Sequence, residues 1–140
     1  MNVAIVYDSA TGNTKAAAEQ MAAMVRAAGH TCTVASIGQA DPAEVTAADA
    51  ICVGSWTKGL YVIRQGPTPA TLNFIGRLGP LDGKPAAVFA TYALAIGKTL
   101  DKMATALSAQ GATVTGRFKS KGPTAADDAD RWIRGLPTTV

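Results

Sequence analysis

The chain has 140 residues, of which 48% are hydrophobic and 16% are charged, and its formal net charge is +3. This length and composition exclude a disordered chain and favour a single domain, residues 1–140, with a real hydrophobic core. No apolar run approaches the roughly 20 residues that span a bilayer, and no basic-plus-aromatic pattern indicates a nucleic-acid surface. We therefore expect a cytoplasmic protein with no membrane insertion and no nucleic-acid partner.

Apolar, strand-like runs alternate with helical patterns along the whole chain. The strand candidates are residues 3–7, 31–37, 50–54, 86–92 and 113–118; the helix candidates are 14–28, 41–48, a short helix opening at Thr68-Pro69, 98–110 and 124–136. Strands that alternate with helices predict a parallel sheet with helices on both faces, which is a three-layer α/β/α fold.

The last strand candidate differs from the others in its pattern. The first, third and fourth candidates are near-continuous apolar runs, as expected of strands buried on both faces. The last one alternates, and Arg117, Lys119 and Lys121 share one parity. Charges placed in this way are typical of a protected edge strand, and a basic docking patch is the functional alternative.

A polar segment, Ser9-Ala10-Thr11-Gly12-Asn13-Thr14, lies where the first strand candidate gives way to the first helix. It offers three hydroxyls, one amide and one glycine, and it contains no lysine. Backbone N–H groups at a helix N-terminus, together with hydroxyls, bind a phosphate without a cation. Capping the helix needs only one such side chain, and neither GxxxxGK[ST] nor GxGxxG is present. This segment, called the phosphate segment below, therefore predicts a phosphorylated cofactor rather than nucleotide hydrolysis.

Two further segments, 55–66 and 91–97, follow strand candidates and should reach the same sheet edge. The first carries Trp56 and Tyr61, which either pack beneath the loop or stack on a planar ligand. The second has no acid and no base, and could wrap a flat apolar ring. A phosphate, a polar spacer and a flat ring describe FMN. The candidate cofactor-binding residues are Ser9, Ala10, Thr11, Gly12, Asn13, Thr14, Ser55, Trp56, Thr57, Lys58, Gly59, Tyr61, Thr91, Tyr92, Ala93, Leu94 and Gly97.

The segment from Tyr7 to Thr14 resembles the flavodoxin phosphate-loop signature [TS]-x-[TS]-G-x-[TS], with every motif position filled. Trp56 is similar to the aromatic residue that flanks the flavin ring, and Tyr92 is similar to the ring-facing residue of the later flavin loop. The resemblance covers the whole chain. It implies a short-chain, flavodoxin-like sheet in the order 2-1-3-4-5, with FMN as cofactor. It also implies a low-potential electron carrier between a reductase and an acceptor enzyme, with no catalytic residue of its own. The two cysteines form no CxxC and no cluster with histidine, so we expect no metal.

That sheet order makes a prediction about the two cysteines. The second and third strands would flank the first, which separates them by about 9–10 Å. A disulfide between Cys32 and Cys52 would need Cα atoms within about 7 Å of each other. Both thiols should therefore be free.

The chain departs from the resemblance in its charge. Electron-carrying flavodoxins are usually acidic around the flavin, whereas residues 55–81 contain no Asp or Glu and carry Lys58, Arg64 and Arg77. These cations and Lys98 have two possible roles. They either only keep the loops solvated, or they stabilise the reduced, anionic flavin and make its reduction potential less negative. A basic rim favours an acidic redox partner, or a small anionic or quinone acceptor. We also expect a monomer rather than an oligomer.

Two functions from different classes fit these residues. The electron carrier is favoured because the site offers no acid/base pair: Asp8 is its only acid, and we expect Asp8 to support the phosphate segment. The alternative is an FMN-dependent NAD(P)H:quinone-type oxidoreductase, with Tyr61, Arg64 and Gln65 lining a pocket over the ring. A carrier dedicated to one enzyme is a third possibility, and fold alone cannot choose among them.

Overall fold

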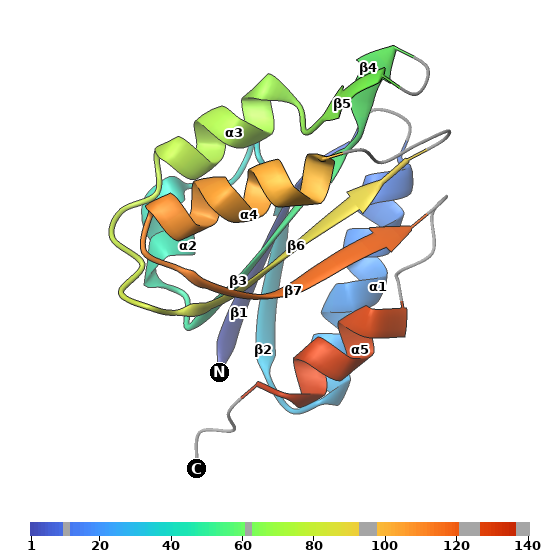
Figure 1. The fold of residues 1–140 in the computed structure, drawn as a ribbon. Helices are drawn as coiled ribbons and strands as arrows, with labels where there is room; N and C mark the ends of the chain where they lie inside the picture. Colours follow the sequence, from blue (N-terminus) through green and yellow to red (C-terminus); the bar gives the residue numbers. More distant parts are fainter. Residues whose placement is uncertain (10–11, 61–62, 93–97, 121–126, 137–140) are drawn as a thin grey trace.

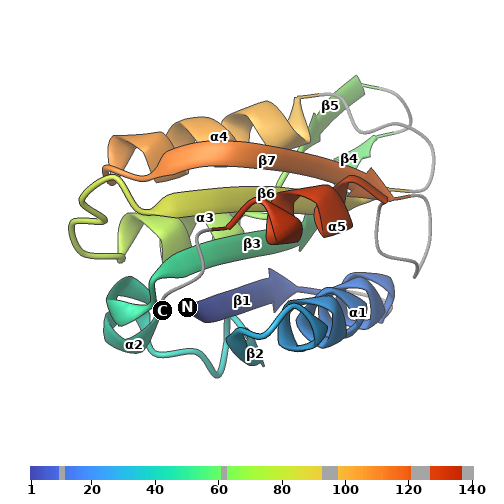
Figure 2. The same cartoon turned by 90° about the horizontal axis from the view of Figure 1, so that it is seen from below.

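The computed structural model describes residues 1–9, 12–60, 63–92, 98–120 and 127–136, leaving out the side chains of 58–60, 63–65 and 127–128. A five-stranded parallel sheet runs through the centre in the order β2-β1-β3-β6-β7 (Figure 1). Figure 2 shows the strands stacked in this order. The predicted order 2-1-3-4-5 is confirmed. The strands are β1 (Asn2–Asp8), β2 (Thr31–Ser36), β3 (Ala50–Trp56), β6 (Pro85–Thr91) and β7 (Thr113–Ser120).

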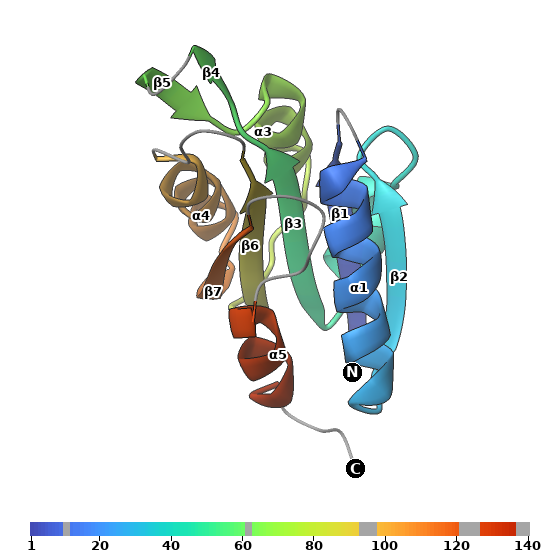
Figure 3. The ribbon, with the colours of Figure 1, turned by 90° about the vertical axis from the view of Figure 1, so that its right-hand side faces the viewer.

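Helices cover both faces of the sheet (Figure 3). On one face lie α1 (Asn13–Ala27) and α5 (Asp127–Arg134); on the other lie α2 (Pro42–Ala47), α3 (Pro69–Gly76) and α4 (Thr99–Ala109). Thr68 caps α3 and Pro69 opens it, as the sequence predicts, since the Thr68 side chain accepts a hydrogen bond from the Thr71 N–H. No helix in the described ranges is long and apolar enough to cross a membrane.

Alternating side chains divide the interior into two cores. Val3 and Ile5 pack with α1 and α5, whereas Ala4 and Val6 pack with α2, α3 and α4. Cys52 is fully buried in the first core, and Cys32 packs against its margin. Both cysteines are free, as predicted. Burial raises the pKa of the Cys52 thiol well above its ordinary value. Burial also raises the pKa of the Cys32 thiol, and the Arg26 guanidinium offsets part of that rise.

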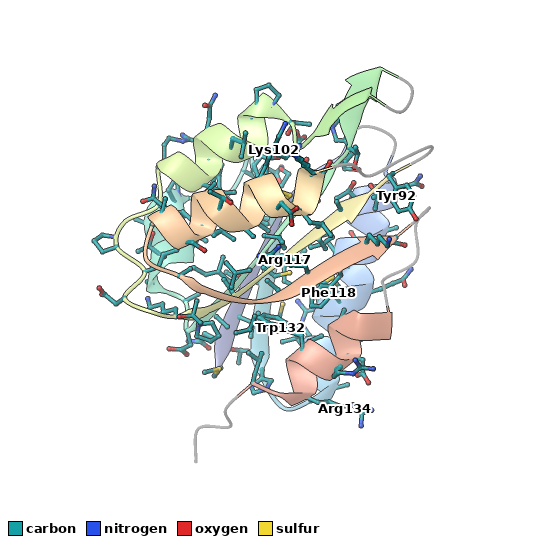
Figure 4. All side chains as sticks on the ribbon, viewed as in Figure 1. Tyr92, Lys102, Arg117, Phe118, Trp132 and Arg134 are labelled. Carbon is teal, nitrogen blue, oxygen red and sulfur yellow. The ribbon has the colours of Figure 1, made fainter. Side chains whose placement is uncertain are left out.

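Two strand glycines make room for aromatic rings in the first core. A Cβ on Gly54 would lie 2.0 Å from Cζ of Phe89, so the Phe89 ring occupies the space that a side chain would need. Gly116 plays the same role, with Cζ of Phe118 at 2.6 Å from its Cβ position. The Phe118 and Trp132 rings meet edge to face at 6.2 Å between centroids (Figure 4). Larger residues at either glycine would displace these rings.

The edge strand β7 contains a bulge that the sequence pattern did not reveal. Ala86 pairs with Val114 and Ala87 pairs with Gly116, so the residue between them, Thr115, is extra. The Thr115 hydroxyl accepts a hydrogen bond from Nε1 of Trp132 at 2.7 Å. Arg117 and Lys119 lie beyond the bulge and are both exposed, as expected of a charged edge strand. Lys121 lies outside the described residues.

The segment 55–66, predicted as a loop, forms a small antiparallel hairpin instead. It consists of β4 (Lys58–Leu60) and β5 (Ile63–Gly66), with Lys58 opposite Gly66 and Leu60 opposite Ile63. The hairpin follows β3 and projects beyond the carboxyl ends of the sheet strands (Figures 1 and 3). It therefore stands at the edge where the cofactor was predicted.

Candidate cofactor site

The carboxyl ends of β1, β3 and β6 lie side by side at one edge of the sheet. The three predicted segments begin at these ends, and the structure brings them together (Figure 1). The first segment leads into α1, the second into the hairpin, and the third toward α4. This is the place where open α/β sheets bind ligands, because the strand order reverses there.

The helix that follows the first segment begins without a side-chain cap. Gly12 occupies the cap position with a φ of 92°, a left-handed conformation that glycine adopts readily. The Ser9 hydroxyl accepts a hydrogen bond from the Gly12 N–H at 3.0 Å, and Asn13 is exposed. No acid lies in the first turn of α1. The positive end of the helix dipole is thus left for an anion. Ala10 and Thr11 lie outside the described residues.

Thr91 joins all three segments at their roots. Its hydroxyl lies 2.6 Å from the Thr14 hydroxyl, and both side chains are buried. Its backbone C=O accepts a hydrogen bond from the Thr57 N–H at 2.9 Å. Hydrogen bonds of Thr91 therefore connect the phosphate segment, residues 55–66 (the hairpin segment) and the third segment, residues 91–97.

The second segment contains an unsatisfied hydroxyl. Oγ1 of Thr57 is buried and has no hydrogen-bond partner among the described atoms. Its neighbour Trp56 is half-buried at the end of β3, and Ser55 is fully buried. The backbones of Lys58 and Gly59 belong to β4, whereas Tyr61 lies outside the described residues. A buried hydroxyl without a partner is costly, so a ligand atom at this position would remove a penalty.

The third segment is described only at its beginning. Tyr92 is half-buried at the carboxyl edge (Figure 4), and its N–H donates to the C=O of Ser120 at 3.1 Å. This hydrogen bond connects the start of the third segment to the end of β7. Ala93, Leu94 and Gly97 lie outside the described residues.

Asp8 has a partner that the sequence did not predict. We expected its carboxylate to support the phosphate segment, which it directly precedes, and two residues of that segment lie outside the described ones. Oδ2 of Asp8 accepts a hydrogen bond from the Thr68 hydroxyl at 2.5 Å. Thr68 is the residue where the chain returns from the hairpin and enters α3.

Lysines at this edge include one that sequence reasoning missed. Lys98 and Lys102 are exposed at the start of α4, one helical turn apart. Nζ of Lys102 lies 3.4 Å from the position that a Cβ on Gly66 would take, so its ammonium sits over the base of the hairpin (Figure 4). Their spacing of four residues could have grouped the two lysines, but the contact with Gly66 is visible only in the structure.

The residues present fit FMN. The uncapped start of α1 suits a phosphate, and the orphaned Thr57 hydroxyl lies in the neighbouring segment that would face the rest of the cofactor. The described residues contain no group of three side chains that could hold a metal ion. Fold and site together define an α/β protein whose sheet presents, at its carboxyl edge, groups suited to a phosphorylated cofactor.

The chain belongs to the flavodoxin family, whose model matches residues 5–132. Members of this family are FMN-binding electron-transfer proteins. The resemblance seen in the phosphate segment is thereby confirmed, and so are the expected cofactor and class of function.

Solved flavodoxin structures are similar over nearly the whole chain. Two-electron reduced flavodoxin from Megasphaera elsdenii is 28% identical, with a TM-score of 0.81, and the match covers 94% of this chain and 96% of that one. A flavodoxin from the domain Archaea is 27% identical, with a TM-score of 0.75, and the match covers 96% and 92%. A short-chain flavodoxin associated with a bacterial microcompartment is 22% identical and shares the fold, with a TM-score of 0.78 and coverage of 96% and 93%. No curated protein matches the chain.

Proposed function

We propose that this flavodoxin is a low-potential electron carrier that takes electrons from a reductase and passes them to an acceptor enzyme. FMN supplies the redox chemistry when bound, and the three segments at the carboxyl edge hold it. The observation that carries this proposal is the convergence of the uncapped start of α1 and the orphaned Thr57 hydroxyl at one edge.

The proposed roles follow the chemistry of each segment. Ser9, Gly12, Asn13 and Thr14, with Ala10 and Thr11, bind the phosphate through N–H groups and hydroxyls. Trp56 and Tyr92 contact the ring, because both aromatic residues stand at the ends of neighbouring strands and are only half-buried. The other proposed cofactor-binding residues are Ser55, Thr57, Lys58, Gly59, Tyr61, Thr91, Ala93, Leu94 and Gly97.

We also propose an acidic redox partner for this edge. Lys98, Lys102 and Lys119 are exposed near the carboxyl ends of the strands, whereas Asp8 is half-buried and bonded to Thr68. Complementary charge accelerates encounter and orients the partners, so the flavin edge would be presented to a negative surface. The same cations would attract a small anionic acceptor. The free thiols of Cys32 and Cys52 support a reducing compartment, and we propose the cytoplasm.

One spectroscopic experiment distinguishes an electron carrier from an NAD(P)H:quinone-type oxidoreductase. The apoprotein is titrated with FMN, and the resulting holoprotein is mixed with NADPH in the absence of air. A carrier keeps its visible flavin absorption until a separate reductase is added. Rapid bleaching by NADPH alone would support the oxidoreductase and contradict the carrier.

A further inference from the structure

A buried group of hydroxyls closes the root of the hairpin segment. This segment leaves the sheet after Trp56 and returns at Thr68. Oγ of Ser55 contacts both ends, since it donates to the Trp56 C=O at 2.8 Å and accepts from the Thr68 N–H at 3.1 Å. The two ends of the segment are therefore held together by one side chain on β3.

Asp8 fastens this closed root to the neighbouring strand. Asp8 is the last residue of β1 and pairs with Ser55 across the sheet. Its carboxylate accepts the hydroxyl proton of Thr68, which is itself only 4% exposed. This bond links the residue before the phosphate segment to the residue that caps α3, 60 positions further along the chain.

The count of protons shows why an acceptor is required at position 8. Oγ1 of Thr68 accepts the Thr71 N–H at 3.2 Å and lies 2.6 Å from the Thr71 hydroxyl. A threonine hydroxyl has one proton, and that of Thr68 is directed to Asp8. The Thr71 hydroxyl must then donate to Thr68. The two hydroxyls carry two protons and share one bond, so removing the carboxylate would leave one proton of this buried pair without its acceptor.

We infer that Asp8 is a positioning residue for the flavin ring. It acts through Thr68 by holding the hairpin segment in place over the ring, and it does not act through the phosphate. The inference rests on the proposed function, since it assumes FMN at this edge. It distinguishes Asp8 from Ser9, its chain neighbour, whose hydroxyl bonds within the phosphate segment.

The test compares FMN with riboflavin, which has the same ring and no phosphate. Asp8→Ala and Thr68→Val should each weaken the binding of both flavins by a similar factor of about ten, the value of a hydrogen bond to a charged group. Asp8→Asn should bind both flavins nearly as the unmodified protein does, because the amide oxygen still accepts the Thr68 proton. Ser9→Ala should weaken FMN binding alone. If Asp8→Ala weakens FMN binding alone, or neither flavin, the inference is wrong.

A second measurement separates positioning from a general loss of stability. At saturating FMN, the visible circular dichroism of the bound flavin should change in Asp8→Ala and Thr68→Val and should be retained in Asp8→Asn. Gly116→Ala is the matched control, since it strains the β7 core without touching this network and should leave the spectrum unchanged. An unchanged spectrum in Asp8→Ala would overturn the inference. A protein that binds neither flavin before substitution would overturn the proposed function instead.

Discussion

At the scale of single residues, the site is organised by hydroxyls that differ in whether they have partners. Thr14 and Thr91 satisfy each other across 77 positions of the chain, whereas the Thr57 hydroxyl has no described partner. The phosphate segment could be proposed from sequence because its polar residues are adjacent. Its pairing with Thr91, and the bond from Asp8 to Thr68, could not, because both depend on which strands become neighbours.

The Thr57 hydroxyl makes a prediction with opposite signs in the apoprotein and the holoprotein. Thr57→Val removes a buried, unsatisfied group, so the free energy of unfolding of the apoprotein should stay constant or rise by up to about 1 kcal/mol. FMN should nevertheless bind about tenfold more weakly, because the cofactor loses a hydrogen bond. Urea unfolding of the apoprotein and FMN titration measure the two effects.

Thr71→Val is the matched control for the unfolding measurement alone, because Thr71 belongs to the hydroxyl network that includes Asp8 and Thr68. The Thr71 hydroxyl is buried and already bonded to Thr68, so its loss should destabilise the apoprotein by about 1–2 kcal/mol. If Thr57→Val also destabilises the apoprotein by about 1–2 kcal/mol and leaves the affinity for FMN unchanged, the Thr57 hydroxyl has a purely structural role.

At the scale of elements, the resemblance to flavodoxins implied the order of the strands, and periodicity predicted the five main strands and the helices between them. It succeeded because strands such as β3 are buried on both faces and therefore carry continuous apolar runs. It failed for the hairpin, whose strands have three and four residues, too few for a period to appear. The bulge at Thr115 was also missed, since a single extra residue leaves the charge alternation of Arg117 and Lys119 intact.

The close packing of neighbouring strands predicts the effect of a single methyl group. Gly54→Ala places a Cβ on the Phe89 ring and should lower the free energy of unfolding by about 1–3 kcal/mol. Gly76→Ala is the control: nothing lies within 4 Å of its Cβ position in α3, so no loss is expected. Urea unfolding of both variants is the measurement. Equal stability of the two would contradict the packing of Phe89 over Gly54.

At the scale of the whole molecule, lysines with no ion-pair partner among the described residues gather near one end of the sheet, where Asp8 is bonded to Thr68 and Asp101 is paired with Arg117. Lys98 and Lys102 stand near the carboxyl edge, whereas Asp49 and Asp82 precede β3 and β6 at the amino edge. Such a distribution orients the molecule in the field of a charged partner. Net charge alone, at +3, did not reveal this separation.

This separation predicts which small oxidants react fastest with the reduced holoprotein. Lys98→Glu combined with Lys102→Glu should lower the ratio of the ferricyanide rate to the hexaamminecobalt(III) rate by about tenfold at low ionic strength. Added salt should reduce that difference, because it screens exposed charges. Arg77, which the sequence grouped with the cations of the rim, lies at the far end of α3 from the hairpin. The control, Arg77→Glu with Arg134→Glu, therefore changes the net charge equally but away from this edge and should leave the ratio nearly constant. An equal fall in both double variants would contradict a localised basic rim.

The most direct test of the account is the visible spectrum of the protein during titration of its apo form with FMN. We predict that the flavin bands shift and that flavin fluorescence changes until one FMN is bound per chain. Ser9→Ala should weaken this binding, whereas Gly76→Ala should not. A protein that stays colourless after purification and takes up no added FMN would contradict the central claim that the carboxyl edge of this sheet is a flavin site.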